Sequence, residues 1–324
     1  MRQGGAAPTG KWQGSASGGV TAPDAIILPT PATRFAVTSM RLKNLSAGHP
    51  MRDWLTFMAQ LAAAQHQAVM ALSTLPIPTL DEIDLATSAG MPPLTTMSHR
   101  RAPAWQDGLA RILDAMALVE LPDQAREVAM QLRAKPSDEM EHLADQFLLQ
   151  HVDIADAGAA LYIAAALQVY LTALAARLPV ERLHLLPQRG LCPCCGATPS
   201  AGLITATGKT PGARYLYCSL CSTSWNHVRA TCITCGESRQ IVLESIEGDE
   251  SAVKAETCGS CGSYAKLIYQ KQDPQADPYA DDFATLGLDI LAAEAGWSRH
   301  APNPLVLVGR GEAQDGKTMA GSLQ

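Results

Sequence analysis

The sequence is dominated by four CxxC pairs, Cys192-Pro-Cys-Cys195, Cys218-Ser-Leu-Cys221, Cys232-Ile-Thr-Cys235 and Cys258-Gly-Ser-Cys261. All 9 cysteines of the 324-residue chain lie in this stretch, which is therefore chemically distinct from the rest. A two-residue spacer lets both thiolates of a tight turn point at one ion, and two such turns supply the four sulfurs of a tetrahedral site. We therefore predict eight metal ligands: Cys192, Cys195, Cys218, Cys221, Cys232, Cys235, Cys258 and Cys261.

The pairs form an internal repeat. A shift of 40 positions carries Cys192 to Cys232 and Cys221 to Cys261, which indicates one supersecondary unit used twice. A glycine follows three of the four pairs, where a knuckle turn requires backbone freedom, whereas Ser222 follows the second pair. Segments rich in β-formers flank the pairs. Each half is therefore predicted to be a zinc-ribbon or rubredoxin-like unit.

The sequence leaves open how the cysteines are grouped and which metal they bind. The repeat is most simply explained by sequential pairing, but a cross-brace that joins the first pair to the third and the second to the fourth uses the same ligands. Four thiolates suit Zn²⁺ and equally a mononuclear iron centre of the rubredoxin type. Cys194 could replace Cys195, although the glycine at 196 favours Cys195, and His227 is an alternative ligand near a knuckle. A thioredoxin-like use of the pairs requires a βαβ setting that the sequence lacks.

The region before the cysteines is predicted to be helical. Met51, Leu55, Met58, Ala62 and Val69 form an apolar stripe at three- and four-residue steps, which Gln65 interrupts. The 20 residues 157–176 carry no charge and are long enough to span a bilayer. Their many alanines and several polar interruptions favour a buried helix of a bundle instead.

These patterns predict an α+β protein: an N-terminal helical bundle, two tandem zinc-ribbon or rubredoxin-like metal-binding units and a C-terminal helix. The expected segments are a disordered extension (1–30), a helical domain (31–187), the metal-binding module (188–272, divided into 188–230 and 231–272), a helix packed on the core (273–310) and a flexible tail (311–324). Acidic residues at 281 and 282 and a glycine at 296 mark the two ends of the last helix.

Charge and motifs exclude several functions. The formal net charge is −6, and residues 192–269 contain six basic and six acidic side chains. Binding to nucleic acid would therefore lack electrostatic support, so a zinc-ribbon regulator of nucleic acid is the alternative rather than the preferred function. No P-loop, nucleophile elbow or HExxH motif is present, and a closed four-cysteine site has no open position for a substrate, so we expect no enzyme. The N-terminus lacks the apolar core of a secretion signal, which predicts a cytoplasmic protein without a membrane span.

Several motifs, taken in order, resemble the FdhE family, whose members are accessory proteins for the biogenesis of formate dehydrogenase. The motifs are Ser46-Ala-Gly-His-Pro50, Cys192-Pro-Cys-Cys-Gly196, Tyr217-Cys-Ser-Leu-Cys221 leading to Trp225, Val228-Arg-Ala-Thr-Cys-Ile-Thr-Cys-Gly236, Ala255-Glu-Thr-Cys-Gly-Ser-Cys261, Ala280-Asp-Asp-Phe-Ala-Thr-Leu-Gly-Leu-Asp289 and Asn303-Pro304.

The resemblance implies a cytoplasmic, non-catalytic assembly factor or chaperone that binds the catalytic subunit of a molybdenum- or tungsten-dependent formate dehydrogenase during its maturation. It also implies a rubredoxin-like iron site, with the CxxC motifs needed for partner binding. Cys194 and the extension before about residue 23 depart from the family pattern. Electron transfer through such an iron is a further alternative, and the sequence does not distinguish a monomer from a homo-oligomer.

Overall fold

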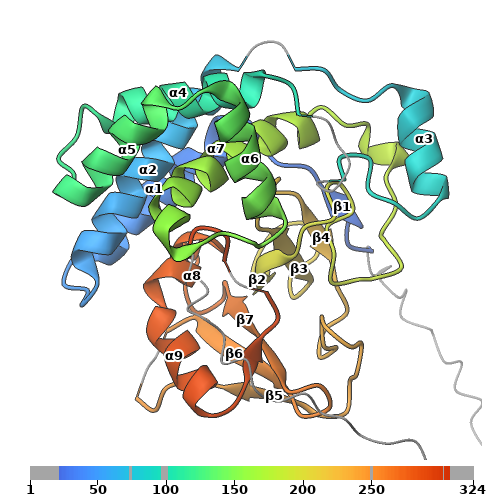
Figure 1. Cartoon of the computed structure of the whole chain (residues 1–324). Helices are drawn as coiled ribbons and strands as arrows, with labels where there is room; N and C mark the ends of the chain where they lie inside the picture. Colours follow the sequence, from blue (N-terminus) through green and yellow to red (C-terminus); the bar gives the residue numbers. More distant parts are fainter. Residues whose placement is uncertain (1–21, 73–74, 96–100, 249–250, 302, 307–324) are drawn as a thin grey trace, which may run out of the picture.

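The first half of the chain is a helical domain. The computed structural model describes residues 22–72, 75–95, 101–248, 251–301 and 303–306. The helices are α1 (Pro31–Ser46), α2 (Arg52–Ala71), α3 (Leu80–Ser88), α4 (Ala104–Met116), α5 (Asp123–Ala134), α6 (Ser137–Leu148) and α7 (Ala157–Ala175). In Figure 1 these helices lie together on one side of a β-sheet, with α3 at the periphery.

Helix α7 is the central helix of this domain. It packs against α2, α4, α5 and α6, and every residue from Tyr162 to Ala175 is buried. By length and composition the segment Ile154–Ala175 could cross a membrane, but 78% of its most apolar window is buried inside the protein. The alanines let neighbouring helices approach this helix closely, as the prediction of a buried bundle helix requires.

The second half of the chain, together with one short strand near the N-terminus, forms an eight-stranded sheet. Its strands are β1 (Ile26–Ile27), β2 (Pro199–Ile204), β3 (Arg214–Cys218), β4 (Ser224–Asn226), β5 (Ile241–Glu244), β6 (Val253–Cys258), β7 (Ser263–Tyr269) and β8 (Ser298–Arg299). The order is β1-β4-β3-β2-β7-β6-β5, with β8 beside β7. Each 40-residue repeat supplies three antiparallel strands, β2–β4 or β5–β7. The mixed helix-and-sheet architecture agrees with the predicted α+β fold class.

The two repeats are joined through direct strand pairing. Strand β2 of the first repeat pairs in parallel with β7 of the second, and Gly202 lies opposite Leu267. This pairing makes one continuous sheet, in which β5 forms the end away from the helical domain (Figure 1). The sequence repeat alone did not predict this pairing, because the pairing joins the first strand of one unit to the last strand of the other.

Two segments differ from the sequence prediction. Strand β1 pairs with β4 at Trp225 and Ser224, so the sheet begins inside the range 1–30 that we expected to be disordered. The predicted C-terminal helix is two helices, α8 (Ala280–Ala284) and α9 (Leu286–Glu294). They are separated at Thr285, which has φ −116° and ψ 32°. The predicted tail 311–324 and residues 1–21 lie outside the described residues.

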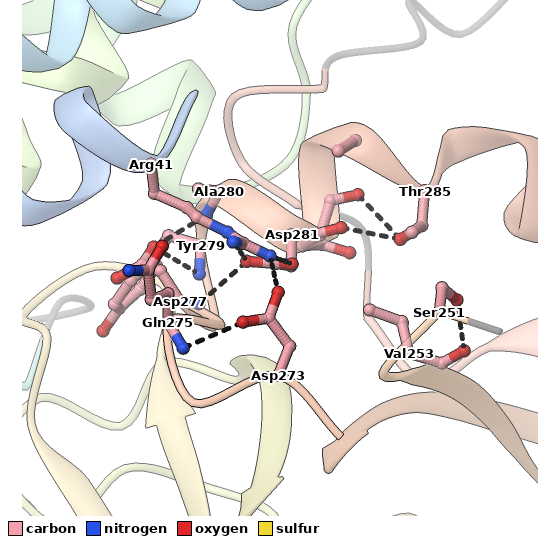
Figure 2. A network of polar contacts seen from close by, with 12 residues as sticks. Arg41, Ser251, Val253, Asp273, Gln275, Asp277, Tyr279, Ala280, Asp281 and Thr285 are labelled. Carbon is pink, nitrogen blue, oxygen red and sulfur yellow. Dashed lines mark hydrogen bonds and ion pairs between the residues drawn. The ribbon is translucent and has the colours of Figure 1, made fainter. Parts of the chain in front are cut away.

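Partly buried charges fix the C-terminal segment to α1, as Figure 2 shows. Arg41 donates to both carboxylate oxygens of Asp281, at 2.9 and 2.6 Å, and to Asp273 at 2.5 Å. Thr38, one turn earlier on α1, donates to Asp277 at 3.0 Å. Because Asp277 also accepts the backbone N–H groups of residues 279 and 280, it orients the start of α8. The helical domain and the sheet are therefore held in one arrangement.

Candidate metal centres

The first four cysteines form a compact cluster, here called site 1: Cys192, Cys195, Cys218 and Cys221. Their Sγ atoms all lie within 4.8 Å of one another, and the Cys192–Cys221 and Cys195–Cys218 Sγ atoms are 3.4 Å apart. A tetrahedral ion with metal–sulfur bonds of about 2.3 Å has sulfur–sulfur edges of about 3.8 Å. The cluster therefore has the dimensions that a four-thiolate metal centre requires.

The last four cysteines form an equivalent cluster, here called site 2: Cys232, Cys235, Cys258 and Cys261. The Cys232–Cys261 and Cys235–Cys258 Sγ atoms are both 3.7 Å apart, close to the tetrahedral edge length. Each site is assembled within its own repeat. The cross-brace alternative is therefore wrong, and the sequential grouping is the one that the fold produces.

The two alternative ligands lie outside both clusters. Cys194 is fully buried but does not belong to the four-sulfur group of site 1, and its carbonyl oxygen accepts the Leu94 N–H at 2.8 Å. The Nδ1 atom of His227 lies 2.9 Å from the carbonyl oxygen of Val228. His227 is thus a buried, hydrogen-bonded histidine beside the sheet.

The knuckle backbones explain the residues that follow each pair. Gly196, Gly236 and Gly262 have φ values of 79°, 77° and 67°, and Ser222 adopts the same left-handed conformation at 60°. Ser222 therefore departs from the glycine pattern in its side chain but not in its backbone conformation. The turn aims amide groups at sulfur, and the N–H groups of Leu220 and Cys221 point at Cys218 Sγ from 3.4 and 3.3 Å.

A buried polar chain connects the helical domain to site 1. Gln65 donates to the side-chain oxygen of Gln168 at 2.8 Å, and Gln168 donates to the carbonyl oxygen of Ser219 at 2.7 Å. From the other side, Tyr279 O–H donates to the Cys218 carbonyl oxygen at 3.1 Å. Gln65 and Gln168 interrupt apolar stripes in the sequence, and this interruption was the available signal that they serve a site.

Ser222 is a second connection between the helical domain and site 1. Its hydroxyl accepts from Arg34 Nε at 2.9 Å and lies 3.0 Å from the hydroxyl of Thr172. The Arg34 guanidinium also lies 3.3 Å from the centroid of the Tyr279 ring. A glycine here would satisfy the turn but would lose both contacts. The serine therefore combines the knuckle conformation with a link to α1 and α7.

Site 2 has a polar and partly open environment. Cys235 and Cys261 are exposed, whereas Cys232 and Cys258 are buried. The Ser263 hydroxyl lies 3.0 Å from Cys261 Sγ and donates to the Thr234 hydroxyl at 2.9 Å. Thr234 in turn lies 2.7 Å from Nδ1 of His300. Short hydroxyl side chains thus surround site 2, whereas the helical domain surrounds site 1.

Both clusters contain thiols with raised pKa values beside one thiol whose pKa is lowered by hydrogen bonds, Cys221 at site 1 and Cys232 at site 2. Burial raises the pKa of Cys192, Cys195 and Cys218 well above the ordinary value, because desolvation disfavours the thiolate. At site 2, burial also disfavours the Cys232 thiolate, but hydrogen bonds from the Cys235 and Thr234 amides outweigh it and lower the pKa to about 6. A bound cation would stabilise thiolates at both sites, so metal binding and folding are expected to be coupled.

A helical domain joined to a sheet that carries two four-cysteine clusters defines an α+β protein with two candidate metal centres. Comparison with known proteins is more specific. Three family models cover the chain in order: FdhE, N-terminal, on residues 23–187, FdhE, central domain, on 191–229, and FdhE, C-terminal domain, on 230–306. The chain belongs to the FdhE family.

Individual relatives agree with this assignment over most of their length. The FdhE homologue of Edwardsiella ictaluri is 37% identical over 285 residues, which is 88% of this chain and 92% of the relative. The homologue of Rhizobium meliloti is 33% identical over 297 residues, or 90% and 96% of the two chains. The crystal structure of FdhE from Pseudomonas aeruginosa superposes with a TM-score of 0.80 at 33% identity, over 88% of this chain and 99% of that one.

Proposed function

We propose that this chain is an accessory protein for the assembly of formate dehydrogenase and that it binds the enzyme's catalytic subunit in the cytoplasm. The observation that supports this most directly is the match to all three FdhE domains together with the assembly of both four-cysteine clusters. Closed sites with four protein sulfurs leave no coordination position for a substrate. A scaffold that holds a partner fits such sites better than an enzyme does.

We propose further that all eight CxxC cysteines are metal ligands, with iron or zinc as the ion. The sulfur–sulfur separations of 3.4–3.7 Å fit either ion. A rubredoxin-type iron supplies one-electron redox chemistry, whereas zinc supplies structure only. The chain's own part is to hold the thiolates, to aim amide groups at the sulfurs and to keep water away from site 1.

A pull-down on the purified catalytic subunit tests the assembly role. Cys→Ser substitution of all eight ligands should abolish capture if the metal-binding module organises the interface. Met130→Ala is a suitable control, because Met130 is 68% exposed on α5 in the helical domain. Capture that persists at full strength in the eight-fold variant would reject a metal-organised interface. Salt-sensitive binding to DNA or RNA in place of capture would favour the nucleic-acid regulator.

The exposure of Cys235 and Cys261 favours a second candidate, electron transfer through a rubredoxin-like iron at site 2. Thiolates at the surface bring the ion close to a redox partner without further contacts. Anaerobic purification followed by metal analysis and visible spectroscopy tests this role. A red ferric protein with thiolate-to-iron absorption bands is expected, and a colourless protein that contains only zinc would exclude it.

A further inference from the structure

We infer that the two sites have different duties: site 1 is a permanent structural centre, and site 2 is the centre whose ion an incoming ligand can reach and exchange. The inference rests on the proposed binding of a cation at both sites, but not on the identity of the partner enzyme. The ligands that yield at site 2 are Cys235 and Cys261. The incoming group is a soft donor, such as a thiolate or an aromatic nitrogen.

The repeat makes the comparison between the sites direct. A shift of 40 positions relates Cys195 to Cys235 and Cys221 to Cys261. The first member of each pair is fully buried, and the second is exposed. Because the ligand set and the sulfur spacing are alike, the difference arises from what packs on the two units.

The second spacer residue inside each CxxC pair follows the same rule, whereas the first spacer Ile233 is buried in the apolar core. In the first repeat (unit 1, residues 188–230), Cys194 and Leu220 occupy the second spacer positions, and both are buried in the apolar core together with the site 1 cysteines. The equivalent residues in unit 2 are Thr234 and Ser260, which are polar and exposed. Cys194 therefore acts as a small core residue beneath Leu94, whose N–H contacts its carbonyl oxygen. Unit 1 is built to be covered, and unit 2 is built to face water.

Access to site 1 requires part of the fold to open. Its second knuckle accepts hydrogen bonds from Gln168 and Tyr279 and is linked through Ser222 to Arg34 and Thr172. An incoming ligand must break these contacts and separate α7 from the sheet before it can approach the ion. At site 2 the exposed sulfurs already border solvent, so the ion can be approached without unfolding.

The exchange step is a simple ligand substitution. With an ion held by site 2, the donor atom of the incoming group would form a bond to the ion as the bond from Cys235 or Cys261 breaks. The released thiolate takes a proton from water, and the oxidation state of the ion does not change. Repetition of this step with a chelator would remove the ion from site 2. Release of the ion from site 1 would be slower, because the fold must open first.

Chelation of the zinc-loaded full-length chain tests the inference. With excess 4-(2-pyridylazo)resorcinol, we expect release in two phases, one ion in each, with rates that differ by at least about tenfold because only site 1 requires contacts to break. The double variant Cys235→Ser/Cys261→Ser should lose the fast phase and keep the slow one. Equal release rates for both ions, or a fast phase that survives in this variant, would overturn the inference.

A second variant probes site 1 without touching a ligand. Gln168→Ala/Thr172→Ala removes two contacts to the knuckle and should accelerate the slow phase on the order of tenfold, since each hydrogen bond contributes to keeping the site closed. The fast phase should stay unchanged, as both phases should in the control Met130→Ala. An accelerated fast phase would contradict the assignment of that phase to site 2.

Thiol labelling supplies an independent readout if a variant fails to fold. Iodoacetamide is added to the wild-type protein during chelation, and modified cysteines are located by mass spectrometry. Cys235 and Cys261 should be alkylated first and the site 1 cysteines last. The reverse order would refute the division of duties even if release were biphasic.

Discussion

Replacing one partner of the Arg214–Glu256 ion pair should destabilise the protein far more than replacing both. The two side chains are 0% and 4% exposed, and they are joined by contacts of 2.7 and 3.2 Å. Arg214 lies on β3 of the first unit and Glu256 on β6 of the second, so the pair spans β2 and β7. Gly202 on β2 lies beneath the pair, where a Cβ would lie 3.1 Å from Leu267 Cδ1 and 3.4 Å from Arg214 Nε.

The magnitude follows from burial. Glu256→Gln leaves the Arg214 cation without a counter-charge, and Arg214→Met does the same to the carboxylate, so each change should cost about 3–5 kcal/mol. The double change Arg214→Met/Glu256→Leu removes both charges at once and should stay within about 2 kcal/mol of wild type. The singles therefore should not add, and the coupling should amount to several kcal/mol.

Urea unfolding of the metal-loaded protein at pH 7, followed by far-ultraviolet circular dichroism, measures these energies. The exposed pair Lys135–Glu139 on the helical side provides the control, because solvent screens it and its removal should change the midpoint little. A double variant whose loss equals the sum of the two single losses would show that the charges do not interact, and it would refute the reasoning.

Three further predictions concern single positions. Ser222→Ala should lower stability by about 1–2 kcal/mol through its two lost side-chain contacts, which thermal denaturation can measure against wild type. Gly190→Ala should disrupt the site 2 knuckle, because its Cβ would lie 2.2 Å from the Ile233 carbonyl oxygen. The control Gly287→Ala places a Cβ that meets nothing within 4 Å and should be neutral or stabilising. Similar urea midpoints for these two variants would contradict the prediction. Burial lowers the pKa of His227 from 6.5 to about 4, so the folded state binds fewer protons and its stability falls as pH drops from 6.5 towards 4. Relative to His227→Gln, wild type should lose about 2 kcal/mol between pH 7 and pH 5, and parallel pH profiles would argue against a buried neutral histidine.

The local features of the metal-binding module could be predicted from the sequence, because they depend on spacing within a few residues. The CxxC turns, the glycines after them and the strands around them are short-range patterns, and the repeat placed eight sulfurs in two groups. The family motifs added the expected function. The join between β2 and β7 could not be predicted in this way, because it pairs residues of the two units more than sixty positions apart in the sequence.

The connection between the helical domain and site 1 was also beyond pattern reasoning. Gln65 and Gln168 lie 103 residues apart, and in the sequence they only reduce the quality of two apolar stripes. Their role becomes clear only in the folded protein, where α2 packs against α7 and Gln168 donates to the carbonyl oxygen of Ser219. A buried glutamine in a helix is costly without a partner, so an interrupted stripe is a reason to search for a partner elsewhere in the chain.

The repeat itself predicts two equal sites, and this is where sequence symmetry misleads. Each unit has the same four cysteines and the same turns, yet one cluster is enclosed by the helical domain and the other is half exposed. The difference arises at positions where the two units carry different residues. Ser222 replaces a knuckle glycine where α1 and α7 attach, and Cys194 and Leu220 stand where unit 2 has Thr234 and Ser260. The matching positions therefore specify that a metal can be held, whereas the mismatched ones specify which site is kept closed.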